Sequence, residues 1–168
     1  IIGSGKDILK TFQYTFQNHQ IEILSFRDSW KNFKKIKKKE KILVSGFHFE
    51  MCKMNYEKFL EYIDKYYNFL KYLGNNCNKL YFVSTDLSVK FSVSRVVFFY
   101  FKILTKLKKK PIYGIKILMF NTLIGFQCSG KNRLKNTLLK FFKIKTMDFK
   151  KMKFLLNKNL LIKDYQIN

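Results

Sequence analysis

The chain has 168 residues, of which 47% are hydrophobic and 18% aromatic, and its formal net charge is +23. This length suits one domain with a real core, and the apolar content excludes a disordered tail. Nearly all of the positive charge is lysine, so the surface should attract the phosphate groups of nucleic acid, anionic lipid or nucleotides.

Patterns typical of helices and strands alternate along the chain. The runs assigned to strands are too continuously apolar for strands with one solvated face, which indicates a parallel sheet covered on both faces. We therefore predict a single domain with a doubly wound α/β fold. In chain order, the predicted elements are a helix over 7–16, a strand over 21–26, a solvated connection or short helix over 31–41, a strand over 41–47, a helix over 56–73 that Gly74-Asn75-Asn76 ends, a strand over 80–83, a helix over 93–107, a strand over 115–120 and a helix over 133–142.

Small hydroxyl residues stand where the predicted strand 80–83 ends. Ser84, Thr85 and Asp86 follow this apolar run directly. In open α/β sheets, ligands collect outside the carboxyl ends of the strands, so these residues mark the predicted pocket. The same residue types also suit an ordinary helix N-cap.

Two glycines and a charged pair have the spacing of a dinucleotide site. Gly3 and Gly5 stand where a first strand becomes a first helix, and glycine there lets the backbone approach a pyrophosphate. The third glycine of that pattern is absent, since Ile8 holds its place, and a tight strand-to-helix turn is an equal alternative. Arg27 and Asp28 follow the second strand, where an acid accepts a ribose 2′-hydroxyl and an arginine favours a 2′-phosphate. A solvent-exposed pair at a strand end remains the other interpretation.

Taken together in this order, the segments resemble the short-chain dehydrogenase/reductase superfamily, especially its extended nucleotide-sugar epimerase and dehydratase branch. The resemblance covers about residues 1–140. It rests on the order and spacing of Gly3-Ser4-Gly5, Arg27-Asp28, Val44-Ser45-Gly46, Asn68-Phe69-Leu70, Val83-Ser84-Thr85, Phe91 to Arg95, and Leu118-Met119-Phe120 running to Gly125.

The resemblance implies a Rossmann-like nucleotide-binding domain over 1–145, followed by a basic carboxyl-terminal extension over 146–168. It also implies NAD or NADP as cofactor and a nucleotide-sugar as substrate, for an epimerase, dehydratase or reductase. The cofactor-binding residues that it implies are Gly3, Ser4, Gly5, Arg27, Asp28, Ser45 and Gly46.

The resemblance assigns catalytic positions to Ser84, Thr85, Phe91 and Arg95. In the family a Tyr-x-x-x-Lys motif supplies the acid/base tyrosine and a lysine that lowers its pKa, while a serine or threonine orients the substrate hydroxyl. Here Phe91 stands at the tyrosine position and has no proton to exchange. Arg95 stands at the lysine position and keeps the charge with a different geometry. The usual redox chemistry is then impaired or absent.

The sequence offers two weaker candidates for catalytic side chains. Tyr67 and Lys71 have the Tyr-x-x-x-Lys spacing but precede the Ser84 strand, so we interpret them as helix surface. His48 follows the strand 41–47, where it would either face the pocket or be solvated.

An RNA-binding structural protein, such as an organellar ribosomal component, is the alternative function. Lysines among Phe141, Phe142 and Phe149 would suit a phosphate backbone with stacked bases, although an amphipathic helix or a membrane-surface helix has the same composition. The abundance of Lys, Asn, Phe, Ile and Tyr is also what an A+T-rich genome produces, so part of the charge needs no functional cause.

Cysteine usage indicates a reducing compartment. Cys52, Cys77 and Cys128 are odd in number and widely spaced, which argues against a disulfide framework or a zinc site, and we expect no metal. No apolar run reaches the roughly 18 residues of a membrane span. We expect a cytoplasmic or organelle-matrix protein, and the initial Ile1 suggests a clipped or fragmentary start with no visible signal peptide.

Overall fold

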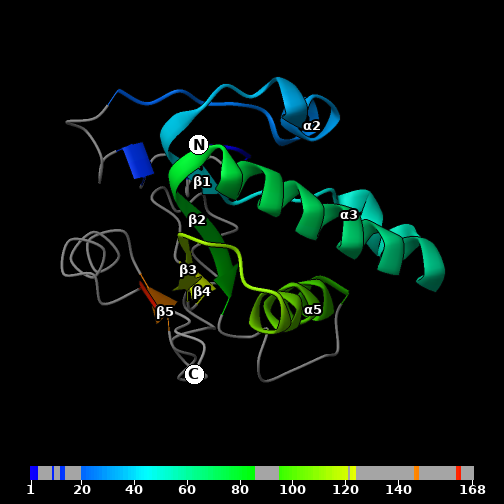
Figure 1. The fold of residues 1–168 in the computed structure, drawn as a ribbon. Coiled ribbons are helices and arrows are strands. Elements are labelled where there is room, and N and C mark those ends of the chain that lie inside the picture. Colours follow the sequence, from blue (N-terminus) through cyan, green and yellow to red (C-terminus); the bar gives the residue numbers. More distant parts are fainter. Residues whose placement is uncertain are drawn as a thin grey trace, which may run out of the picture.

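The computed structural model describes residues 1–3, 9, 12–13, 20–85, 95–120, 122–123, 146–147 and 162–163. Helices and strands alternate along the longest described stretches (Figure 1). The elements are α2 (Phe26–Lys31), the 3-10 turn η1 (Phe33–Lys35), β1 (Lys39–Val44), the 3-10 turn η2 (Phe49–Lys53), α3 (Tyr56–Asn75), β2 (Cys77–Thr85), α5 (Arg95–Lys109), β3 (Ile115–Phe120), β4 (Thr122–Leu123), β5 (Thr146–Met147) and β6 (Ile162–Lys163).

The central sheet has the order β1-β2-β3-β6, and β1, β2 and β3 are parallel to one another. The short β6 pairs antiparallel with β3, and β4 pairs with β5 in a separate two-stranded sheet. The predicted α/β character and the parallel sheet are thus confirmed. The doubly wound Rossmann-like arrangement stays a prediction, and so does the domain division near residue 145.

The main core lies between the sheet and the helices α3 and α5. These two helices pack against each other and against the same side of β2 (Figure 1). Strand residues Ile42, Val44, Leu80, Phe82 and Ile117 supply the sheet side of this core, and each is at most 4% exposed. The helix α3 supplies Phe59, Tyr62, Ile63, Tyr66, Phe69, Leu70 and Leu73.

The opposite side of the sheet is buried as well. Leu43, Val83 and Leu118 alternate with the core residues along the strands, and all three are buried. Phe12, one of the described helical residues of the predicted helix 7–16, is fully buried. The strands are therefore continuously apolar because both of their faces are buried, as the sequence indicated.

The helix α3 forms where the sequence predicts it, and its ends are capped. The Asn55 side chain accepts a hydrogen bond of 2.9 Å from the Lys58 N–H, which satisfies one of the first-turn donors. At the other end, the Asn76 N–H donates to the Leu73 carbonyl, and the Asn76 amide donates to the Tyr72 carbonyl. The helix thus ends two residues later than expected.

The strand predicted over 21–26 is wrong at its end. Among the bridges between described residues, the one in this segment joins Leu24 to Ile2, and α2 begins at Phe26. The Ser25 side chain accepts a hydrogen bond from the Asp28 N–H and so starts a helix at once. The strand 41–47 likewise lies earlier, over Lys39–Val44, whereas β2 is longer than expected and α5 ends two residues later than expected.

The predicted helix 133–142 lies outside the described residues. So does most of the predicted carboxyl-terminal extension 146–168, of which only β5 and β6 are described.

Candidate functional site

The order of the strands reverses beside β1. Ile2 forms parallel bridges with Val44 on one side and Leu24 on the other, so the chain runs outward from residue 2 to residue 24. It then crosses to β1 and continues in the opposite direction to β2 and β3. In open α/β sheets a ligand crevice forms outside the carboxyl ends of the strands at such a reversal. Gly3 and Ser45 directly follow the two strand segments that flank it.

Two glycines from distant parts of the sequence meet at this reversal. Gly3 has a φ of +58°, a conformation that residues with a side chain rarely adopt. A Cβ on Gly3 would lie 2.6 Å from the Phe26 Cβ and 3.1 Å from the Gly46 Cα. A Cβ on Gly46 would lie 3.0 Å from the Gly3 Cα. The site therefore requires glycine at both positions, and the requirement comes partly from Phe26.

Two tyrosines of α3 fix the loop that carries Gly46. The Tyr66 hydroxyl donates a hydrogen bond of 2.6 Å to the Gly46 carbonyl, and the Tyr62 hydroxyl accepts one of 2.9 Å from the His48 N–H. Burial raises the pKa of Tyr66 well above its ordinary value, so this phenol remains a donor. Tyr62 and Tyr66 are four residues apart and thus share one helix face. The loop that follows β1 is therefore held by α3.

An aromatic cluster lies beside the two glycines on the α2 side. The Phe26 ring stacks on Trp30, with centroids 5.7 Å apart, and meets His48 edge-on at 5.1 Å. Trp30 is half-buried and also contacts Tyr62 and His48. His48 is therefore a half-buried member of this cluster. Because Trp30 is the one tryptophan of the sequence, its fluorescence reports on this part of the molecule.

Serine hydroxyls stand at the carboxyl ends of both β1 and β2. The Ser45 hydroxyl donates to the Gly3 carbonyl and so ties the two edges of the reversal together. Ser84 is 2% exposed, and its hydroxyl has no hydrogen-bond partner within the described part of the chain. Buried hydroxyl groups nearly always have a partner, so an orphan at a strand end is compatible with a role toward a ligand.

Arg27 and Asp28 lie in the first turn of α2, beside the crevice. Both side chains are exposed, and the Asp28 N–H is capped by the Ser25 hydroxyl. The sequence placed them after a strand, and the structure places them at the start of a helix. Their charged ends are accessible to a ligand.

Arg95 makes contacts that the sequence did not indicate. Its guanidinium donates to the Met54 carbonyl and lies 5.3 Å from the centre of the Phe59 ring. Arg95 thereby joins the start of α5 to the start of α3, and its contact with a ribose stays a prediction. Ser4, Gly5 and Phe91 lie outside the described residues, and Thr85 is described only as the last residue of β2.

The pair Tyr67 and Lys71 lies on α3, as predicted. Lys71 is exposed, and the half-buried Tyr67 donates a hydrogen bond of 2.7 Å to the Lys110 carbonyl. This bond joins α3 to the end of α5, far from Ser84 along the strand direction. The tyrosine therefore has a structural contact where it lies.

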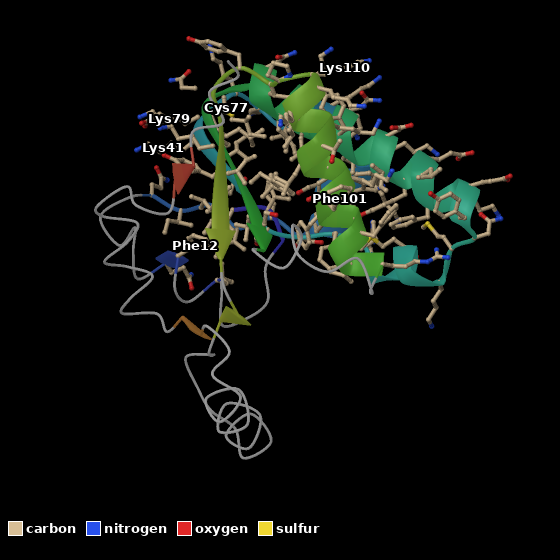
Figure 2. The ribbon with its side chains drawn as sticks, turned by 90° about the horizontal axis from the view of Figure 1, so that it is seen from below. Phe12, Lys41, Cys77, Lys79, Phe101 and Lys110 are labelled. Atoms are coloured by element: carbon tan, nitrogen blue, oxygen red, sulfur yellow. The ribbon has the colours of Figure 1, made fainter. Side chains whose placement is uncertain are left out.

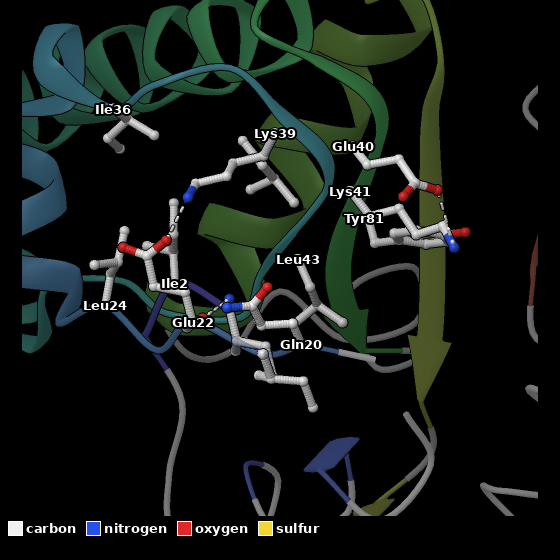
Figure 3. Close-up of a pocket in the computed structure, with 13 residues that line it drawn as sticks. Ile2, Gln20, Glu22, Leu24, Ile36, Lys39, Glu40, Lys41, Leu43 and Tyr81 are labelled. Atoms are coloured by element: carbon white, nitrogen blue, oxygen red, sulfur yellow. Dashed lines mark hydrogen bonds and ion pairs between the residues drawn. The ribbon is translucent and has the colours of Figure 1, made fainter. Parts of the chain in front are cut away.

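A separate hollow lies along β1, from Lys39 to Leu43 (Figure 3). It has a volume of about 660 Å³. Four of its charged groups form two ion pairs. Lys39 pairs with Glu22 at 2.5 Å, and Lys41 pairs with Glu40 at 3.4 Å. The lining of this hollow does not include Gly3, Gly46 or Ser84, whereas ligands of open α/β sheets bind beyond the carboxyl ends of the strands. We therefore place the candidate site at Gly3, Gly46 and Ser84.

Sequence reasoning identified the small residues of the site and missed the aromatic ones. Phe26, Trp30, Tyr62 and Tyr66 shape the crevice, and only the spacing of the two tyrosines signalled a common helix face. Within the described ranges, no group of three or more His, Cys, Asp or Glu side chains could hold a metal ion. None of the helices in the described part combines the length and the apolar character that crossing a membrane requires.

No protein-family model matches the chain, and neither does any curated protein or any solved structure. The function proposed below therefore rests on the geometry of this site.

Proposed function

We propose that the protein binds a dinucleotide, NAD or NADP, at the carboxyl edge of the sheet between Gly3 and Gly46. The observation that carries this proposal is the reversal of strand order at Ile2, together with a glycine in the left-handed conformation at the strand end. In a dinucleotide-binding fingerprint, the first glycine stands at such a strand end and makes the tight turn from strand to helix. The geometry of Gly3 fits that role.

The surrounding residues suit the parts of a dinucleotide. Backbone near Gly3 would lie against the pyrophosphate, and the exposed Arg27 and Asp28 would meet the adenosine ribose. Asp28 favours NAD, whose ribose offers a 2′-hydroxyl, and Arg27 favours the 2′-phosphate of NADP. The half-buried Trp30 and His48 would border the bound molecule on the α2 side.

The finer proposal is an epimerase-like or dehydratase-like protein that acts on a nucleotide-sugar. The buried hydroxyl of Ser84 supports a substrate contact at the end of β2, because it has no partner within the described residues. When bound, the nicotinamide would supply hydride transfer. With Phe91 at the position of the family's tyrosine, the chain lacks the acid/base group for that step, so we propose binding with impaired catalysis.

The test is a titration of the full chain with NADH and NADPH, followed by energy transfer from Trp30 to the nicotinamide. Saturable quenching of the Trp30 emission with sensitised nicotinamide emission would support the proposal. Arg27→Gln should weaken NADPH more than NADH, and Asp28→Asn should weaken NADH more than NADPH. Both side chains are exposed, so neither substitution should disturb the fold.

The control is Lys31→Gln, which removes an exposed charge at the far end of α2. It should leave both affinities unchanged. Absence of saturable binding with both dinucleotides would overturn the cofactor proposal. If Arg27→Gln and Lys31→Gln weakened both affinities equally and Asp28→Asn strengthened both, the effects would come from general charge and not from specific contacts of Arg27 and Asp28.

A further inference from the structure

Exposed lysines gather at the amino edge of the sheet, opposite the candidate dinucleotide site. Hydrogen bonds join the segments that carry them: the Tyr72 hydroxyl donates to the Lys34 carbonyl, and the Leu80 N–H donates to the Gly114 carbonyl. Figure 2 shows Lys41, Lys79 and Lys110 at this one end of the molecule. The lysine edge, as we name it, consists of the exposed Lys34, Lys35, Lys37, Lys38, Lys71, Lys79, Lys108, Lys109 and Lys110.

Acidic residues do not balance this charge. The sequence has no Asp or Glu over residues 65–85 or 87–147. Three carboxylates on this side of the described part are already engaged, since Glu22 pairs with Lys39, Glu40 with Lys41 and Asp64 with Lys106. The excess positive charge is therefore available to a partner.

Helix dipoles explain only part of the clustering. α3 and α5 run antiparallel to the strands, so both of their carboxyl ends lie at this edge, where positive charge is favoured. Each helix end is equivalent to roughly half a negative charge, far less than the lysines present. An A+T-rich genome accounts for the number of lysines and not for their position. Carboxylates Glu57 and Glu61 lie at the other end of α3.

Tyr113 lies at this edge, in the turn between α5 and β3. It is 99% exposed, whereas its neighbour Ile112 is buried and packs against Gly74. Gly114, with a φ of +72°, completes the turn. The turn is thus anchored by Ile112, and a bare phenol ring stands beside Lys108–Lys110.

A second hollow, of about 420 Å³, adjoins these lysines between α3 and α5. Its volume falls in the range of small-molecule sites, roughly 300–1,000 Å³. Because Asp64 pairs with Lys106, the net charge of the lining comes from Lys109 and Lys110. The lining residues are Asp64, Tyr67, Asn68, Lys106, Lys109 and Lys110.

We propose that the lysine edge binds a single-stranded nucleic acid, with lysines on the phosphates and Tyr113 stacked on a base. An electropositive strip with an accessible aromatic ring is the usual means of holding unpaired strands. A duplex offers no free base face to Tyr113. A membrane-binding surface needs several apolar side chains to insert, and Tyr113 is the one exposed large hydrophobic residue of this edge within the described residues.

The test is fluorescence anisotropy of a labelled oligonucleotide of about 12 nucleotides, as RNA and as DNA, with the full chain at several salt concentrations. Tyr113→Ala should weaken binding at least about fivefold, the lower end of what base stacking contributes. The triple change Lys108→Gln, Lys109→Gln, Lys110→Gln should reduce the salt slope by about 2. Tyr113 and these lysines are exposed, so the variants should keep the circular dichroism spectrum of the parent chain.

The matched controls lie at the other end of the molecule. Tyr56→Ala removes a 56% exposed tyrosine, and Lys53→Gln with Lys58→Gln removes two exposed lysine charges, to be compared with the double change Lys109→Gln and Lys110→Gln. Control variants that bind as weakly as the edge variants would overturn the proposal, as would binding that Tyr113→Ala leaves unchanged. Stronger binding to vesicles of anionic lipid than to either oligonucleotide, lost in the edge variants, would assign the surface to membranes. The outcome is independent of NAD or NADP binding.

Discussion

Replacing Gly3 by alanine tests whether the two halves of the candidate site meet as tightly as the structure shows. An alanine in the left-handed conformation costs about 1–2 kcal/mol, of which a part is offset by the lower entropy of the unfolded chain. The new Cβ would also lie 2.6 Å from the Phe26 Cβ, a backbone-attached atom that cannot rotate away. Such overpacking adds about 1–3 kcal/mol. We expect Gly3→Ala to lower the free energy of unfolding by about 2–4 kcal/mol.

Gly114→Ala is the matched control. Gly114 has a φ of +72°, and a Cβ there would meet only the Asn78 carbonyl oxygen, at 3.2 Å. This variant should therefore lose about 1 kcal/mol, nearly all of it from the backbone conformation. It lies at the amino edge of the sheet and should not change dinucleotide binding, whereas Gly3→Ala should weaken it.

The assay is urea denaturation followed by Trp30 fluorescence and by circular dichroism. Trp30 contacts Phe26, so the fluorescence also reports a displacement of α2 in the native state. Equal losses of stability in the two variants would refute the close approach of Gly3, Phe26 and Gly46. A thermal melt should show the same order, at roughly 2–4 °C per kcal/mol for a chain of this size.

The remaining predictions concern buried hydroxyl groups. Tyr66→Phe removes the donor to the Gly46 carbonyl and should cost about 1–1.5 kcal/mol in urea denaturation; an unchanged midpoint would mean that the bond does not stabilise the loop. Burial raises the pKa of Tyr66 and of Tyr100, so each phenol holds its proton more tightly in the folded than in the unfolded chain. Their contribution to the free energy of unfolding is therefore complete below pH 10 and should fall as the pH rises above it. Tyrosinate absorbance should show these two phenols ionising only as the chain unfolds. Neither the Ser84 nor the Ser29 hydroxyl has a partner within the described residues, so Ser84→Ala and the matched Ser29→Ala should leave the stability of the ligand-free protein unchanged. Only Ser84→Ala should weaken binding of a nucleotide-sugar, as measured by calorimetry.

The elements that the sequence predicts best are those whose signals are local. The helix α3 combines an Asn cap, apolar residues at helical spacing and a Gly-Asn-Asn end, so its start was predicted correctly and its end within two residues. The strand β3 has the predicted bounds, because Ile115–Phe120 is apolar except for Lys116 and follows a Pro-containing turn. A predicted boundary was wrong where a polar side chain ended the element within its apolar run. Ser25 does this, because its hydroxyl caps α2.

The candidate site was predictable only in part. Small residues at strand ends pointed to Gly3, Ser45, Gly46 and Ser84, because their types are unusual directly after apolar runs. Nothing in the linear pattern showed that Phe26 would lie over both glycines, since contacts over such separations depend on strand order. Likewise, the spacing of Arg95 from Phe91 predicted a contact between its guanidinium and a ligand, and in the structure this guanidinium contacts the Met54 carbonyl.

The sequence by itself determined the α/β class, the sites of most helices and strands, and the strong positive charge. Those properties follow from composition and from apolar periodicity, which are local. Only the tertiary structure decided that Ile2 lies between Leu24 and Val44, because hydrogen-bonded register joins residues far apart in the chain. It also separated the two ends of the sheet. Helices that run antiparallel to parallel strands bring their lysine-rich carboxyl ends to one edge and leave the glycines and serines at the other.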